Sequence, residues 1–141
     1  MSIVYIGLAI EKKLLISYTP INMNYLGMVL KIINQLDEDK EYKSSEKYKE
    51  NSIIYYIHSN HITYICIDFF QVGDSNSFNF LLDIQKEFQK IFPKFDILNY
   101  DSSYITETFK STMIMMLDDF INTDYDNNKN DKNNSEQKAV C

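Results

Sequence analysis

The chain has 141 residues, enough for one domain with its own core, and a net charge of −6. All 14 basic residues are lysine, which argues against sites that hold phosphate or carboxylate groups with the planar fork of arginine. The acidic charge argues against partners such as nucleic acid and anionic membranes, because both attract basic surfaces.

The first third of the chain predicts a β-hairpin followed by a helix. The apolar run 3–10 is typical of a strand buried on both faces, 11–13 predicts a turn, and 14–18 predicts a second strand. Asn22 or Asn24 can cap the helix that follows. Its apolar residues recur at helical spacing and predict a buried stripe made of Leu26, Val29, Leu30, Ile33 and Leu36.

The middle of the chain contains the clearest hairpin. Residues 37–51 are charged and polar and predict a loop with at most one weak edge strand. Residues 52–58 and 61–68 predict two strands joined by a turn at Ser59-Asn60. This register leaves His58 and His61 at solvated turn positions, far along the strand from Cys66, so the sequence predicts no metal site.

The last part of the chain predicts two helices and a tail. One helix begins at Asp74 or Ser75 and ends at Pro93, and another opens at 101–103. Residues 122–141 are almost entirely polar and are predicted to be disordered, which places the folded domain at 1–121. The stripe that should face the core in the last helix consists of Ile105, Phe109, Met113, Met116, Leu117 and Phe120.

The residues that could act in catalysis do not form the pattern of an active site, so the sequence predicts no enzyme. Nothing resembles a Ser/His/Asp or Cys/His site, and the three glycines are too scattered for a phosphate-binding loop. The sequence therefore predicts no catalytic residue and no cofactor. The apolar run at the N-terminus ends after about eight residues, too short for a signal sequence or a membrane span, so we expect a soluble, cytosolic chain.

Two segments carry a resemblance to a known family. Residues 51–68 form a tyrosine-rich hairpin, and nine residues later a helix opens with Phe78-Asn79-Phe80-Leu81-Leu82. Together with the N-terminal strand, this pattern resembles the longin domain over residues 2–121, with Ser77 where the family usually has a small apolar residue. The resemblance implies a profilin-like α+β fold of order β-β-α-β-β-β-α-α. Its five-stranded antiparallel sheet would have one helix on one face and two on the other, with the weak strand near Ser44 to Lys49.

The resemblance also implies a function. Longin domains of this kind are regulatory heads of R-SNAREs, the synaptobrevin-like vesicle-associated membrane proteins, on the cytoplasmic face of endomembrane vesicles. Expected partners are a SNARE helix, from the same protein or a cognate SNARE, and sorting adaptors or coats. The family's docking groove lies between the first helix and the third strand. We expect Leu26, Leu30 and Ile33 to be buried beneath it and Met28, Ile32, Tyr42 and Tyr48 to be free for a partner. The groove predicted here comprises Leu26, Met28, Val29, Ile32, Ile33, Tyr42, Tyr48 and Ile53.

The remaining predictions concern the C-terminal tail and the alternative functions. A SNARE motif needs several heptads and a central arginine, and residues 122–141 have neither. We expect this tail to begin a linker to a SNARE motif outside the chain, and membrane attachment only through such a segment; a longin-only protein is the other possibility. Two further hypotheses stay open: a longin-fold subunit of a tethering or adaptor complex, and a small cytosolic enzyme.

Overall fold

The computed structural model describes residues 3–21, 23–49, 51–69 and 74–140, without the side chains of 74–75 and 124–140. The order of its elements is the one that the resemblance implies. The elements are β1 (Ile3–Ile10), β2 (Lys13–Tyr18), α1 (Leu26–Gln35), β3 (Tyr42–Lys49), β4 (Ser52–Ser59), β5 (Ile62–Phe69), α2 (Asp74–Ile91) and α3 (Ser102–Val140).

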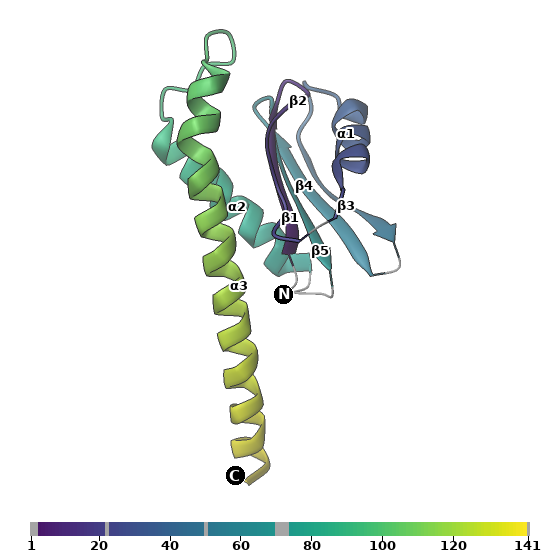
Figure 1. Cartoon of the computed structure of the whole chain (residues 1–141), viewed down its shortest axis with the longest axis vertical. Helices are drawn as coiled ribbons and strands as arrows, with labels where there is room; N and C mark the ends of the chain where they lie inside the picture. Colours follow the sequence, from purple (N-terminus) through teal and green to yellow (C-terminus); the bar gives the residue numbers. More distant parts are fainter. Residues whose placement is uncertain (1–2, 22, 50, 70–73, 141) are drawn as a thin grey trace.

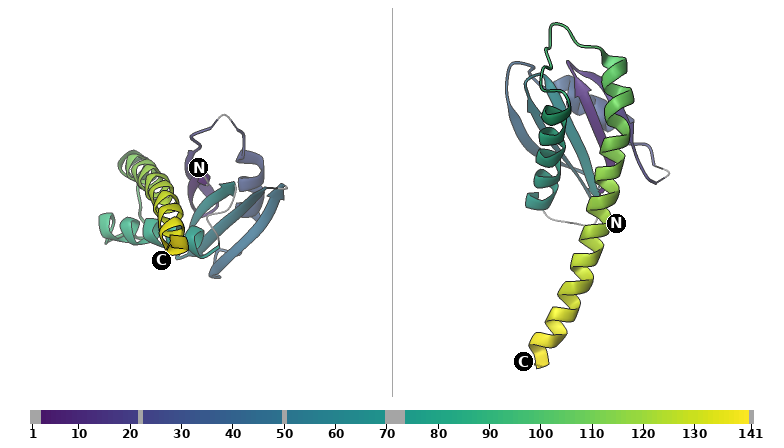
Figure 2. Two further views of the ribbon diagram at one scale, coloured as in Figure 1. Left: turned by 90° about the horizontal axis from the view of Figure 1, so that it is seen from below. Right: turned by 90° about the vertical axis from the view of Figure 1, so that its left-hand side faces the viewer.

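The strands form one antiparallel sheet in the order β2-β1-β5-β4-β3. Helices α2 and α3 cover one face, and α1 covers the other (Figure 1). Within the two-helix layer, α2 lies over β4 and β5 while α3 lies over β1 and β2 (Figure 2). The predicted profilin-like arrangement, with one helix on one face and two on the other, is confirmed.

Strand β3 is longer than the sequence predicts, and it forms an edge of the sheet. Its side chains alternate between half-buried residues such as Tyr42 and exposed ones such as Lys43. Charged side chains on an edge strand discourage pairing with another chain. The polar sequence of β3 made this strand difficult to predict. The same polarity suits its position at an exposed edge of the sheet.

Both hairpins turn over two residues with positive φ. The values are 51° and 65° at Glu11 and Lys12, and 54° and 67° at Asn60 and His61, the backbone of type I′ turns. The second turn lies one residue later than the predicted Ser59-Asn60. His58 therefore belongs to β4 and is buried, so the prediction that it is solvated is wrong.

Gly7 makes room for a tyrosine that lies on the sheet. A Cβ atom at this position would come within 2.8 Å of the Tyr5 hydroxyl oxygen. That hydroxyl lies 2.9 Å from Ser17 Oγ on the neighbouring strand. A larger residue at position 7 would push the Tyr5 ring away from Ser17.

Two of the three predicted helix-end signals are confirmed. The N-cap of α1 is Tyr25, without a side-chain cap bond; Asn24 Oδ1 accepts only from Leu26 N–H at 3.1 Å, in a turn before the helix, and Asn22 lies outside the described residues. Asp101 Oδ1 accepts from the backbone N–H groups of Ser103 and Tyr104 at 3.0 and 3.1 Å, which caps α3. Helix α2 ends two residues before Pro93, in agreement with the loss of a backbone donor at proline.

The buried stripe of α1 differs from the prediction. Leu26 is 44 % exposed and Leu30 only half-buried, while Ile32 is buried together with Val29 and Ile33. The apolar residues cover about 200° of the helix circumference, a wider arc than the part that is buried, so their spacing alone does not say which part of that arc faces the sheet. In α3 the prediction holds, because Ile105, Phe109, Met113 and Leu117 are buried and Met116 and Phe120 are half-buried.

Helix α3 continues through the segment that the sequence predicts to be disordered. Its backbone is helical to Val140, beyond the end of the sheet (Figure 1). Extending an existing helix does not repeat the unfavourable nucleation step, which explains how a polar segment can stay helical. The domain boundary at residue 121 remains a prediction. No helix within the described residues is both long and apolar enough to span a membrane.

Candidate functional site

The predicted groove residues on α1 lie at different depths. Val29, Ile32 and Ile33 are 0–2 % exposed and belong to the core beneath α1. A partner could reach them only if α1 left the sheet. The prediction that Ile32 is free for a partner is therefore wrong, and these three residues support the site without forming its surface.

Ile53 lies on the opposite face of the sheet. It is paired with Lys47 in the β3–β4 register, whereas Tyr42 is paired with His58. Successive residues of a strand point to opposite faces, so Ile53 and the two β3 tyrosines cannot line the same groove. Ile53 packs instead against the core under α2 and α3.

Leu26 and Met28 lie on different flanks of α1. Residues two apart on a helix are separated by about 200°, so these two side chains cannot face the same neighbour. Met28 packs, half-buried, against the same core cluster as Tyr42 and Tyr48. Leu26 has no place in that cluster and is exposed.

Three of the predicted residues, Met28, Tyr42 and Tyr48, therefore pack half-buried against the same core cluster, and we name them the α1–β3 surface. The two tyrosines lie near opposite ends of β3, about 20 Å apart. The Tyr42 hydroxyl accepts a hydrogen bond of 3.1 Å from Asp37 N–H, and its ring meets His58 edge-on at 6.0 Å. Lys49 Nζ lies 5.2 Å from the centre of the Tyr48 ring, close enough for a cation–π contact. These contacts orient the two rings while leaving both half-exposed.

A family comparison decides what kind of domain carries this surface. The model of the longin family, described as a regulated-SNARE-like domain, matches residues 15–113, from within β2 into α3. The chain belongs to the longin family. Longin domains regulate membrane trafficking and are not enzymes, which gives this chain its broad role. No curated protein matches the chain.

Sequence reasoning missed one residue of this longin domain's candidate site, Tyr25. It is only 3 % exposed, and its ring meets those of Tyr5 and Tyr48 edge-on at 6.0 and 6.1 Å. Its hydroxyl has no hydrogen-bond partner among the described residues, and burial, followed by the nearby Tyr48, raises its pKa. The sequence did contain a signal for the burial of Tyr25, because Tyr25 lies one helical turn before Val29 of the predicted apolar stripe. A buried hydroxyl without a partner is uncommon enough to mark a functional candidate.

A polar cluster around His58 lies beside Tyr42, near the end of β4. Glu38 Oε2 is 3.7 Å from His58 Nε2 and 3.4 Å from His61 Nδ1, while His58 Nδ1 lies 2.7 Å from Thr63 Oγ1. In the described part of the longin domain, no group of three or more His, Cys, Asp or Glu side chains is placed to hold a metal ion. Burial strongly raises the pKa of the Cys66 thiol, so this cysteine lacks the thiolate of a nucleophile.

Proposed function

We propose that this longin domain is the regulatory N-terminal head of an R-SNARE. It binds a SNARE helix or a sorting adaptor on the α1–β3 surface, on the cytoplasmic face of endomembrane vesicles, and performs no catalysis. The observation that carries this proposal is that three side chains with apolar bodies, Met28, Tyr42 and Tyr48, each pack half-buried against the core cluster beneath α1. They flank a helix and an open sheet edge in a domain whose family regulates trafficking.

The chemistry of the surface supports an amphipathic helix as the partner. Such helices bind by placing apolar anchors at i, i+3, i+4 and i+7 in an apolar groove. Methionine adapts its shape to different anchors, and tyrosine offers both a ring and a hydroxyl. A partner that displaces the Tyr48 ring would uncover the Tyr25 hydroxyl and could give it the hydrogen bond for which the described residues offer no partner.

The exposed apolar residues support a free-standing head rather than an obligate subunit. An obligate subunit exposes a large continuous apolar patch when isolated. In the described residues, the exposed large hydrophobics are spread over the α1 segment, the α2–α3 loop region and the middle of α3. They are Met23, Leu26, Leu98, Tyr104 and Met115.

The test is a double substitution in the whole chain, Met28→Glu with Tyr48→Glu, titrated calorimetrically with a synthetic R-type SNARE motif. We expect a loss of affinity of at least about tenfold, because two central apolar contacts become charged. Met115→Glu, on exposed α3, is the matched control and should bind as the wild type does. Circular dichroism checks that all variants are folded.

Two outcomes would contradict the proposal. A folded double variant with wild-type affinity would refute the α1–β3 surface as the binding site. Failure of the wild-type chain to bind either an R-type motif or the three cognate SNARE motifs would refute the SNARE partner. Coprecipitation with an adaptor subunit, lost in the same double variant, would keep the surface and assign it to sorting.

A further inference from the structure

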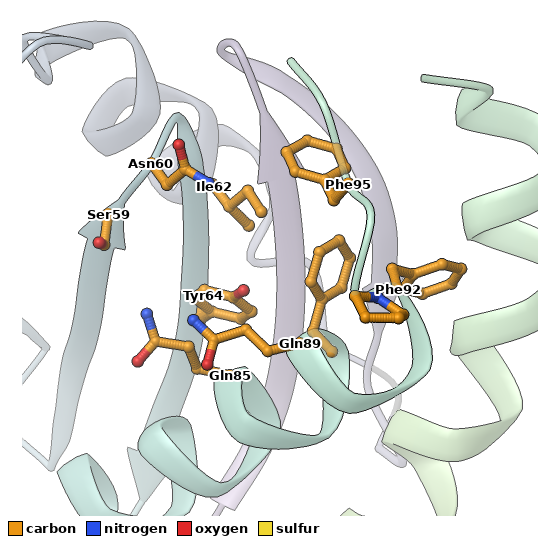
Figure 3. Close-up of a pocket in the computed structure, with 10 residues that line it drawn as sticks. Ser59, Asn60, Ile62, Tyr64, Gln85, Gln89, Phe92 and Phe95 are labelled. Atoms are coloured by element: carbon orange, nitrogen blue, oxygen red, sulfur yellow. The ribbon is translucent and has the colours of Figure 1, made fainter. Parts of the chain in front are cut away.

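Two hollows meet at the end of the fold where α2 passes into α3, away from the α1–β3 surface. They share the side chains of Phe92, Pro93 and Phe95. Phe92 turns toward α3, whereas Phe95 lies near Ile62 at the end of β5 (Figure 3). The segment that connects α2 to α3 therefore has a hollow on each side.

The first hollow has an aromatic floor and an uncharged polar rim. Its volume is about 120 Å³. The rings of Tyr64 and Phe88 belong to its lining, and Gln85 and Gln89 extend over it from successive turns of α2 (Figure 3). Asn60 adds a third amide from the β4–β5 turn. Amides both donate and accept hydrogen bonds, so this rim suits a peptide backbone rather than a charged group.

The second hollow is larger and carries charge at its rim. Its volume is about 290 Å³, and its lining combines Ile91, Phe92 and Tyr104 with Asp96 and Asp101. Both hollows are smaller than typical small-molecule sites, which measure about 300–1,000 Å³. Each hollow can therefore hold an apolar side chain of a partner, and in the second hollow that side chain would lie beside carboxylates.

Exposed apolar side chains stand next to these hollows. Leu98 is 91 % exposed, the largest exposure among the described large hydrophobics, and Tyr104 is 59 % exposed. The backbone that presents Leu98 is held in place, because its N–H donates to Asp96 Oδ1 and the N–H of Asn99 donates to the Asp96 carbonyl, both at 3.0 Å. A hydrogen-bonded turn therefore holds the Leu98 side chain in solvent. Exposing this apolar side chain to water costs free energy, and a partner that covered it would remove that cost.

The same end of the fold is acidic. The Tyr100 hydroxyl donates to Glu11 Oε1 at 3.5 Å, which joins the α2–α3 loop to the first hairpin. Ser59 Oγ, in the lining of the first hollow, donates to Glu41 Oε1 at 3.1 Å. Glu38 reaches His61 in the second hairpin. These three carboxylates come from two loops beside the hollows, and the second hollow is itself lined by Asp96 and Asp101 together with one lysine, Lys94. The excess of carboxylates favours a cationic partner.

We propose that this α2–α3 end, formed by the two hollows with Leu98 and Tyr104, binds a short lysine- or arginine-rich peptide segment of a partner protein through one or two apolar anchors. Its charge repels nucleic acid and anionic membranes. Helix α3 runs away from this end of the fold (Figure 1). This site is separate from the α1–β3 surface and does not depend on the SNARE proposal.

The test selects peptides without assuming their sequence. A display library of random 12-residue peptides is panned against the whole chain, and the dissociation constants of the enriched peptides are measured by fluorescence anisotropy. We expect peptides that combine lysine or arginine with Leu, Phe or Met, and binding that weakens as salt increases. Leu98→Ser with Tyr104→Ser should raise the dissociation constant about tenfold, and Glu41→Lys should reduce both affinity and salt dependence.

Matched controls separate this site from the rest of the domain. Met115→Ser removes an exposed apolar side chain from mid-α3, and Asp118→Lys reverses an exposed charge there; both should leave binding unchanged. The Met28→Glu/Tyr48→Glu variant should also bind normally. Enrichment of no peptide, enrichment of peptides without basic residues, or binding that survives Leu98→Ser/Tyr104→Ser would each overturn the proposal. Loss of binding only in the Met28/Tyr48 variant would do the same.

Discussion

The two faces of the sheet are built differently. Under α2 and α3, Phe88 touches the rings of Tyr64, Phe95 and Phe109 edge-on, at centroid distances of 6.2, 5.5 and 5.4 Å. Under α1, the ring contacts run through tyrosines, and one of their hydroxyls is buried without a described partner. One face is covered by two long helices over a cluster rich in phenylalanine, and the other by a helix of ten residues over a cluster whose buried rings are tyrosines.

Because of this difference, the two faces contribute differently to the stability of the domain and to its binding of partners. The α2–α3 face buries large aromatic side chains completely, which supplies the strongest apolar stabilisation. The α1 face leaves Tyr42, Tyr48 and Met28 half-buried, so it retains contacts that a partner can complete. The comparison predicts that substitutions under α2 and α3 unfold the domain, whereas those under α1 alter stability less and binding more.

The largest effect is expected for Phe88→Ala. This side chain is 1 % exposed and stands at the centre of the aromatic cluster, so its loss leaves a cavity that the long helices cannot collapse. We expect a loss of about 4 kcal/mol in the free energy of unfolding, measured by urea denaturation. A loss below about 2 kcal/mol would mean that the two-helix face is as adaptable as the other.

A smaller loss is expected for Ile32→Ala under α1. Ile32 is 2 % exposed, but the short helix above it can move toward the sheet and fill part of the cavity. We expect about 2–3 kcal/mol in the same urea experiment, together with weaker binding of the R-type SNARE motif because α1 shifts. If Ile32→Ala destabilises more than Phe88→Ala, the ranking of the two faces is reversed.

The smallest effect is expected for Tyr25→Phe, and it has the opposite sign. Removing a buried hydroxyl that has no hydrogen-bond partner should raise the free energy of unfolding by about 1 kcal/mol. Tyr5→Phe is the matched control, because that hydroxyl pairs with Ser17 at 2.9 Å, and its removal should cost about 1 kcal/mol. Equal losses in both variants would show that the Tyr25 hydroxyl is satisfied in solution.

Local sequence signals determined most of the fold. Alternating and apolar runs predicted the strands, Asp101 predicted the start of α3, and Pro93 predicted the end of α2, because each acts on neighbouring backbone groups. The resemblance supplied β3, whose polar edge sequence lacks a strand pattern. The turn at Asn60-His61 was missed by one residue, because several residue pairs there can adopt positive φ and only the strand register selects one.

The candidate site depended on tertiary structure. The sequence placed Met28 on the first helix, and the resemblance placed Tyr48 in the third strand but left Tyr42 outside it, whereas the structure includes both tyrosines in β3. Strand periodicity alone would have excluded Ile53 once the register was known. Only packing decided that Ile32 turns inward and Leu26 outward, because the apolar arc of α1 is wider than its buried part. The α2–α3 end likewise required the folded chain, since its carboxylates come from loops far apart in sequence and meet only where the hairpins and helices end together.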